Sequence, residues 1–280
     1  MNAGDGLRLR PPADGADGAR RAEVEVAVDS PWFSGHFPGE PVLPAMAQIG
    51  LVARLALAPL AGLDGVRFAR AVQPGDRLVV SLAAAGAAGR ARFALTRGAG
   101  GGAVSDGVAL LGDAAATPPT AAAELRDATP PGGRAADPGA VLPHAPPARL
   151  AETVLRLGDA AIACLGSVPP GHPSVAAGRA GAWMALELAA QAAGILQAAR
   201  EARKGEEGEA EDGGRAPRVG YIVRLRDVRF ARPDLPAGEP LVATVIEDGG
   251  GGPLSLFRAC VELAGEALAS AVLATFVPAR

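Results

Sequence analysis

The chain has 280 residues, of which 49% are hydrophobic and only 4% aromatic, so Ala, Val and Leu must build most of its core. Its formal net charge of −3 offers no bulk attraction for nucleic acid. No uncharged apolar run reaches about 18 residues, and the polar N-terminus does not resemble a signal peptide, so no membrane span is expected. Two cysteines in apolar contexts, Cys164 and Cys260, are typical of a reduced, cytoplasmic protein.

The first half is predicted to contain a strand, a helix and four further strands. Residues 1–20 are rich in Gly, Pro, Asp and Arg and are expected to be disordered. Alternation over 22–28 indicates a half-buried strand, and the apolar run from Pro44 to Ala58 predicts a buried central helix. Gly- and Pro-rich turns then separate four expected strands, at 66–73, 77–84, 90–97 and 103–111.

The second half follows a segment, 114–141, that is rich in Ala and Pro, lacks periodicity and is predicted to be a linker. Its predicted elements are strands at 150–157 and 160–165, a helix at 182–203, and strands at 219–230, 241–247, 254–263 and 266–276. The charged residues 204–217 have no apolar face and are expected to form an exposed loop.

An internal repeat links the two halves. The residues Val66-Arg67-Phe68-Ala69-Arg70 recur 162 positions later, beginning at Val228, and a Pro/Gly turn follows each copy. The repeat predicts two copies of one structural unit, residues 21–113 and residues 142–280.

The stretch with the most distinctive chemistry is PWFSGHFPGEPVLPAMAQIG, residues 31–50. It holds His36 in a Pro/Gly loop just before the predicted helix. The simplest interpretation is a buried loop histidine. The alternative is an imidazole beside the free amides of a helix N-terminus, an arrangement suited to proton abstraction next to a carbonyl.

This stretch resembles the active-site motif of the hotdog-fold 3-hydroxyacyl-[acyl-carrier-protein] dehydratases, which runs His-Phe-Pro-Gly-x-Pro-x-x-Pro-Gly. The matching residues are His36, Phe37, Pro38, Gly39, Pro41 and Pro44, whereas Ala45 replaces the last glycine. In that family a glutamate follows on the helix, with a glutamine four residues later. Their positions here are Gly50 and Arg54, so this half lacks the acid.

The second predicted helix supplies a carboxylate instead. Glu187 is the only charged residue between Arg179 and Arg200, and Gln191 lies one turn further on. This segment resembles the family's Glu-x-x-x-Gln helix, although a partly solvated carboxylate at the helix edge is the alternative. The whole second half resembles the hotdog dehydratases of aryl-polyene biosynthesis, where a similar Pro-His-x-Pro occurs, and His144 in that motif is expected to be structural.

The resemblance implies an α+β double hotdog, with two antiparallel sheets that each wrap a long central helix and join edge to edge into one continuous sheet, as an intramolecular pseudo-dimer. In such dimers the histidine comes from one unit and the acid from the other. His36 would therefore meet Glu187. The reciprocal pair, His172 with Gly50, would be a degenerate second site without an acid.

By the same resemblance, the chain would remove water from a 3-hydroxyacyl thioester in fatty-acid, polyene or polyketide-type biosynthesis. His36 would be the base and Glu187 the acid. The Gly39 amide would polarise the thioester oxygen, and Gln191 would orient the acid. Small side chains are expected to line an acyl tunnel, namely Ala47, Gly50, Ala185 and Ala189. No metal spacing and no phosphate-binding loop are found, so no cofactor is expected.

The expected partner is an acyl carrier protein or coenzyme A thioester, and double-hotdog units could also form higher oligomers. Arginines outnumber acids over 66–97 and 218–232 and could steer an acidic carrier protein, although ordinary solvated strand faces explain them almost equally well.

Two other functions stay open. One is a hotdog acyl thioesterase in which Glu187 activates water, and the other is a non-catalytic subunit that binds acyl chains or scaffolds a separate dehydratase.

Overall fold

The computed structural model describes residues 4–86, 89–98, 100–113, 136–206, 218–251 and 253–278. The elements of the first half are β1 (Leu7–Leu9), β2 (Ala13–Asp14), β3 (Arg20–Val26), η1 (Pro31–Phe33), α1 (Ala45–Leu55), β4 (Leu60–Phe68), β5 (Arg77–Leu82), β6 (Arg90–Arg97) and β7 (Ala103–Leu111). Those of the second half are α3 (Pro138–Val141), β8 (Ala151–Leu157), β9 (Ala161–Gly166), β10 (Arg179–Gly181), α4 (Met184–Glu206), β11 (Tyr221–Phe230), β12 (Asp234–Pro236), β13 (Leu241–Gly251), β14 (Leu254–Leu263) and β15 (Glu266–Phe276).

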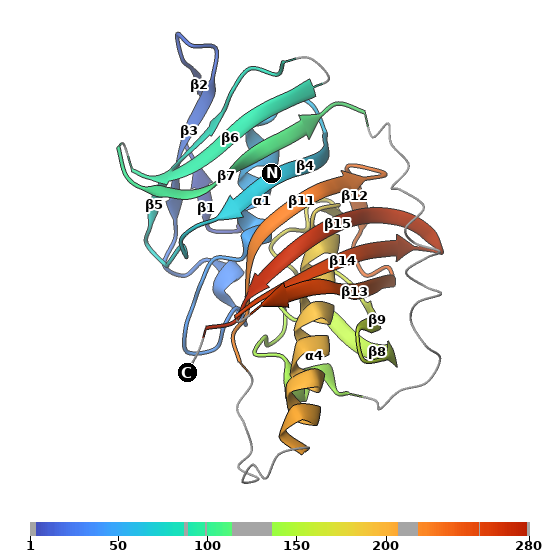
Figure 1. Ribbon diagram of the computed structural model, residues 1–280. Helices are drawn as coiled ribbons and strands as arrows, with labels where there is room; N and C mark the ends of the chain where they lie inside the picture. Colours follow the sequence, from blue (N-terminus) through green and yellow to red (C-terminus); the bar gives the residue numbers. More distant parts are fainter. Residues whose placement is uncertain are drawn as a thin grey trace.

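Nearly all strands belong to one antiparallel sheet of 13 strands, in the order β1-β3-β5-β6-β7-β4-β11-β15-β14-β13-β9-β8, with β2 beside β3 (Figure 1). The order has two equivalent halves that meet at β4 and β11. Apart from β2, each strand of the first half has a counterpart at the mirrored place in the second, from β4 and β11 at the centre to β1 and β8 at the edges. The fold is therefore an α+β pseudo-dimer of two similar units.

The central pair of strands joins the two units in a symmetric way. Arg67 pairs with Arg224, which lies 162 positions after Gly62 and is its repeat counterpart. Gly62 in turn pairs with Arg229, the repeat counterpart of Arg67. This is the isologous contact of a two-fold dimer, made here within one chain. The approach is close enough that a Cβ at Gly62 would lie 2.3 Å from the Val228 carbonyl oxygen.

The expectation that the two half-sheets join edge to edge is confirmed, because the β4–β11 pairing fuses both halves into a single sheet. The expectation of a long helix in each unit is wrong. Only α4, with 23 residues, is long, because α1 has 11 residues and ends where Ala56 becomes extended, just ahead of Pro59. The helix α1 packs on β3 and β5, and α4 packs on β8, β9 and β13 to β15 (Figure 1). No helix within the described ranges is long and apolar enough to cross a membrane.

Most predicted strands are confirmed, and four of them match to the residue: β6, β7, β14 and β15. The largest shift concerns β4, which was expected at 66–73 but spans Leu60–Phe68. It begins early because both neighbours, β7 and β11, pair with its first residues. After Phe68 the chain leaves the sheet, and this exit borders the cavity described below.

The N-terminal residues were expected to be disordered, which is wrong for the described part. β1 and β2 both pair with β3, so the first unit begins before residue 21. Asp5 is 2% exposed, accepts a hydrogen bond from the Leu7 amide and forms an ion pair with Arg54 on α1. Composition could not predict that this segment is ordered, because its ordering depends on Arg54, which is 49 positions away from Asp5.

Two other expected segments fall largely outside the described residues. Of the predicted linker 114–141, residues 114–135 are not described, and residues 138–141 form α3, capped by the Asp137 side chain. Of the predicted loop 204–217, residues 207–217 are not described, and α4 continues to Glu206.

The buried ion pair gives a direct test of the ordered N-terminus. Replacing Asp5 with Asn leaves the Arg54 guanidinium without its countercharge and should lower the free energy of unfolding by about 3 kcal/mol, measured by chemical denaturation. The matched control is Glu25→Gln, because Glu25 pairs with Arg8 on the surface at 3.2 Å, where both side chains are more than half exposed. That change should cost at most about 0.5 kcal/mol. Equal effects of the two substitutions would contradict an anchored N-terminus.

Candidate active site

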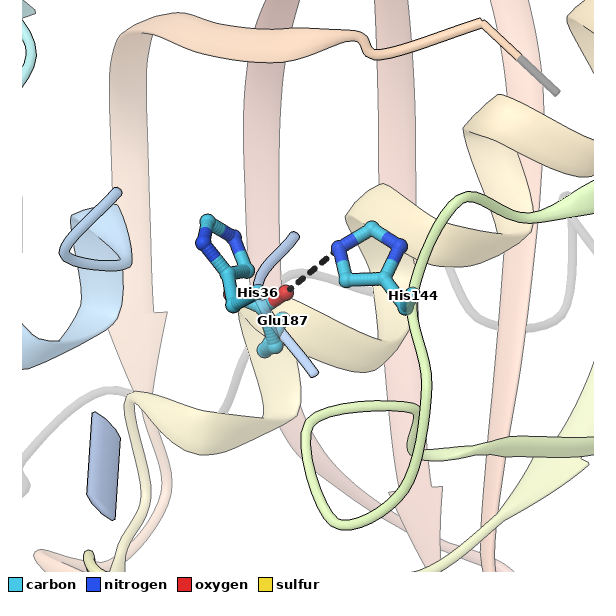
Figure 2. A group of neighbouring side chains, drawn as sticks. All are labelled: His36, His144 and Glu187. Atoms are coloured by element: carbon cyan, nitrogen blue, oxygen red, sulfur yellow. Dashed lines mark ion pairs between the residues drawn. The ribbon is translucent and has the colours of Figure 1, made fainter. Parts of the chain in front are cut away.

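Three titratable side chains meet in a cavity of about 490 Å³ between the two units. They are His36 from the loop before α1, His144 from the segment before β8, and Glu187 from the first turn of α4. Their donor atoms all lie within 4.8 Å of one another. Figure 2 shows the two imidazoles on either side of the carboxylate. The structure therefore brings together the histidine and the acid that the resemblance assigned to opposite units.

His36 is held in one tautomer. Its Nδ1 lies 2.7 Å from the Val42 carbonyl oxygen, which can only accept, so Nδ1 carries the proton and Nε2 keeps its lone pair. The side chain is buried, and burial lowers its pKa to about 4. At neutral pH His36 is therefore an uncharged imidazole with a free basic nitrogen.

Glu187 is the complementary group. It is 6% exposed, and burial raises its pKa to about 7, opposed by a hydrogen bond from the Gln191 amide to Oε1 at 3.2 Å. A carboxyl group with this pKa is protonated in a large fraction of molecules at neutral pH. The alternative of a solvated carboxylate at the helix edge is thus wrong.

His144 is the group that the sequence did not identify as part of the site. Its Nε2 lies 3.7 Å from Glu187 Oε1, and its ring packs edge-on against Phe37 at 4.7 Å and His36 at 5.2 Å between centroids. Burial and then the neighbouring His36 and Arg149 keep its pKa well below the ordinary value. Its Pro-His-x-Pro setting was the available signal, but a lone histidine in a Pro-rich turn carries no indication of what it faces.

The segment that carries His144 is fixed from both units. The Ala145 amide donates to the Gly35 carbonyl oxygen at 3.0 Å, next to His36. At the other end Gln191 donates to the Ala148 carbonyl oxygen at 2.8 Å and accepts from the amides of Leu150 and Ala151. One amide side chain therefore positions both Glu187 and the chain beside it.

The expected second site differs from the first in chemistry as well as in its missing acid. The Ser174 amide donates to His172 Nδ1 at 3.2 Å, which makes that nitrogen the acceptor and places the proton on Nε2, the opposite tautomer to His36. The group that faces Gly50 is the Trp183 indole, 3.6 Å from where a Cβ would stand, so the expected pairing of His172 with Gly50 is not formed. His172 instead packs against Trp32 and borders a small hollow together with Glu187.

Gly39 does not occupy the place expected for an oxyanion donor, since it is exposed and does not line the cavity. Its φ of +81° shapes the loop instead. Ala45 and Gln48 of α1 do line the cavity, and no side chain caps this helix. The amides of Ala45 and Met46, in its first turn, have no acceptor within the helix.

None of the four small residues expected to form the tunnel lines the cavity. Ala47, Ala185 and Ala189 are fully buried in the core, and Gly50 faces Trp183. The α4 residues on the cavity wall are Glu187, Ala190, Gln191, Gly194, Gln197, Ala198, Glu201 and Ala202. They follow Glu187 at steps of three and four, whereas Ala185 and Ala189 lie two positions away on the face toward the sheet.

Two further expectations concern an acidic partner and a metal ion. The arginines expected to attract an acidic partner are in part neutralised by local acids, in the pairs Arg67–Asp106, Arg90–Asp64, Arg97–Asp76, Arg218–Glu201 and Arg232–Glu266. No metal spacing was found in the sequence, yet two neutral imidazoles and a carboxylate are a donor set that suits a divalent cation. The sequence does not reveal this group because its members stand far apart, at positions 36, 144 and 187.

The contact between Gly35 and Ala145 can be tested within one loop. A Cβ at Gly35 would stand 2.0 Å from the Ala145 carbonyl oxygen, whereas one at Gly39 would meet nothing within 4 Å, and both residues have a φ of +81°. Gly35→Ala should therefore destabilise the protein by about 2 kcal/mol more than Gly39→Ala, because it adds a steric clash to the same backbone strain. Thermal unfolding of both variants measures the difference, and similar losses would refute this docking of the two units.

Comparison with known proteins agrees with this division of the chain. Residues 14–108 match the ApeI-like family, described as ApeI dehydratase, and residues 136–280 match the ApeP-like family, described as ApeP dehydratase. The 3-hydroxyacyl-[acyl-carrier-protein] dehydratase FabZ of Thermomicrobium roseum is 50% identical over 66 residues, which cover 19% of this chain and 44% of that protein. The chain thus spans about half the length of the curated relatives that it matches.

Solved structures share the fold over nearly the whole chain. The dehydratase domain of PpsC from Mycobacterium tuberculosis, in complex with C12:1-CoA, is 14% identical with a TM-score of 0.65 and covers 96% of this chain and 98% of its own. The dehydratase domain of RzxB from Pseudomonas fluorescens is 13% identical with a TM-score of 0.67 and the same coverage. These likenesses show the double-hotdog fold. Because residues 136–280 make up more than half of the chain, the protein belongs to the ApeP-like dehydratase family, with an ApeI-like unit joined in front.

Proposed function

We propose that the chain is a hydro-lyase that removes water from a 3-hydroxyacyl thioester to give a 2-enoyl thioester. One observation carries this proposal: an uncharged imidazole with a free Nε2 and a carboxyl group with a raised pKa face one cavity from opposite units. The matches to ApeI-like and ApeP-like dehydratases and to FabZ support the same reaction and thioester substrates.

The reaction needs one base and one acid. His36 Nε2 takes the proton from C2, and the electron pair of that C–H bond forms the C2=C3 double bond. The C3–O bond breaks as Glu187 gives its proton to the leaving hydroxyl, which departs as water. The site then holds an imidazolium and a carboxylate, and one proton transfer between them restores the starting state.

The first turn of α1 supports the base by stabilising charge on the thioester oxygen. In this proposal the amides of Ala45 and Met46, at the uncapped start of α1, donate to that oxygen as the C2 proton leaves, in place of the Gly39 amide expected from the sequence. Gln191 supports the acid through its hydrogen bond to Glu187 Oε1.

The carrier of the thioester is proposed to be an acyl carrier protein or coenzyme A. The cavity wall includes Arg70 and Arg218, and a guanidinium group suits the phosphate of a pantetheine arm. Two other functions remain candidates from the sequence, a thioesterase and a non-catalytic subunit. The neutral base beside the acid favours elimination over both, because a thioesterase needs only a water-activating carboxylate and a scaffold needs neither group.

The decisive experiment is a steady-state assay of the purified chain on 3-hydroxyacyl and 2-enoyl thioesters. The chain is expected to eliminate water from the 3-hydroxyacyl thioester and to hydrate the 2-enoyl thioester, without release of free thiol. His36→Ala and Glu187→Gln should each lower kcat at least about 100-fold, because each removes one end of the proton transfer. His172→Ala should keep much of the activity. Free thiol from the wild-type chain would identify a thioesterase, and no reaction at all would identify a non-catalytic subunit.

The pKa values of the two groups predict a bell-shaped pH dependence of kcat/KM. His36 must be unprotonated, so activity falls as the pH drops through about 4. Glu187 must be protonated, so activity also falls as the pH rises through about 7. A pH series with wild type and His172→Ala checks both limbs, which should coincide for the two proteins. A rate that keeps rising from pH 7 to pH 9 would rule out Glu187 as the acid.

A further inference from the structure

His144 is an imidazole, 10% exposed, that the proposed proton transfers do not use. Its Nδ1 is buried and has no hydrogen-bond partner among the described residues, and its Nε2 points toward Glu187 Oε1 at 3.7 Å (Figure 2). Buried polar nitrogens are normally satisfied, so a side chain in this state at the wall of a cavity needs an explanation. A distance of 3.7 Å is longer than a hydrogen bond, but a movement of less than about 1 Å by either side chain closes it, and an ionised Glu187 attracts the donor.

The position of His144 is built by both units, which argues against a loop side chain that lies there by chance. The amide of the next residue, Ala145, is held by Gly35 of the His36 loop, and the Ala148 carbonyl oxygen is held by Gln191. The ring itself packs edge-on against His36 and Phe37. Its place relative to Glu187 is therefore fixed by the same contacts that fix the rest of the site.

The geometry points to His144 as a positioning residue that directs the proton of Glu187 to Oε2. The inference rests on the proposed elimination. Gln191 already donates to Glu187 Oε1, and a neutral His144 that carries its proton on Nε2 faces the same oxygen at 3.7 Å, where a small movement of either side chain lets it donate. An oxygen that accepts two hydrogen bonds is the carbonyl-like one, so the acidic proton resides on the other oxygen, free to be donated to the substrate hydroxyl. After the transfer, the same two donors stabilise the carboxylate.

Other titratable or charged groups border the same space and could influence Glu187. His36 lies across the carboxylate, His172 borders the small hollow beside it, and Arg149 acts on His144. The remaining groups on the cavity wall are Arg70, Glu201, Arg218 and Tyr221. A test must therefore remove the His144 nitrogens while leaving these groups and the dryness of the cavity unchanged.

The variant His144→Phe meets this requirement because it keeps an aromatic ring of similar width and removes both nitrogens. The pKa of Glu187 should rise by about one unit in this variant, since the ionised form loses a donor. In the assay, the upper limb of kcat/KM should move up by the same amount. The value of kcat at pH 6 should fall about 10-fold, with KM changed less than two-fold, because the proton is no longer confined to one oxygen.

Two matched variants complete the design. His144→Gln restores an N–H donor of similar reach and should recover most of kcat and of the pKa shift. His172→Phe makes the same substitution at the histidine that the proposed elimination does not need, and it should leave the upper limb unmoved. Thermal unfolding of each variant establishes that it is folded.

The readout that does not depend on turnover is an infrared titration of the Glu187 carboxyl band, identified by its loss in Glu187→Gln. An upward shift of that titration in His144→Phe, reversed in His144→Gln, supports the positioning role even if the wild-type chain eliminates no water, in which case only the proposed function fails. An unchanged or lowered Glu187 titration in a folded His144→Phe protein overturns the inference, whatever the activity.

Discussion

The pairing of β4 with β11 is the contact on which the rest of the molecule depends. It joins the inner edges of the two half-sheets in a two-fold register, with Arg67 opposite Arg224 and Gly62 opposite Arg229. Two sheet edges that would otherwise be exposed become the centre of one sheet. Since the helices lie on the sheet they belong to, this register also sets where the His36 loop of one unit stands relative to α4 of the other. A site shared between units follows from the backbone pairing before any catalytic side chain is considered.

Joining two units in one chain removes the need for them to be identical. A symmetric dimer of one sequence would carry the histidine loop and the acid twice, whereas here each unit keeps one of them. The other positions have taken up structural roles. Where the acid would stand on α1, Gly50 makes room for the Trp183 indole, and at the place of the following glutamine Arg54 binds Asp5 and the Leu7 carbonyl oxygen. Gln191, its counterpart on α4, binds the chain just before β8. Both residues thus anchor the edge strand of their unit, and only one of them also serves the site.

Local patterns and the repeat were sufficient to predict most of the fold. Strands bounded by glycine turns, such as 90–97 and 266–276, were predicted to the residue because hydrophobic alternation and turn chemistry agree there. The meeting of His36 with Glu187 was implied by the resemblance to hotdog dehydratases, which rested on the loop motif in one half and on Glu187 and Gln191 in the other. What could not be read from the sequence depends on contacts between distant segments. The ordering of residues 4–20 requires Arg54 and β3, and the position of His144 requires Gly35. Glu187 points into the cavity, so the α4 residues that line it are those on the same helix face as Glu187. The small residues with that spacing are Ala190, Gly194 and Ala198, not Ala185 and Ala189.

Desolvation gives the site its electrostatic character. A buried ion is costly, so the same dry surroundings lower the pKa of His36 and His144 and raise that of Glu187, and all three groups tend toward their uncharged forms at rest. The elimination we propose creates one positive and one negative charge, on groups whose donor atoms lie within 4.8 Å. Their mutual attraction is stronger in a dry cavity than in water, which offsets part of the cost of forming them there. The surroundings that hold the resting groups neutral therefore also favour the return of the proton from His36 to Glu187, because recombination removes both buried charges at once.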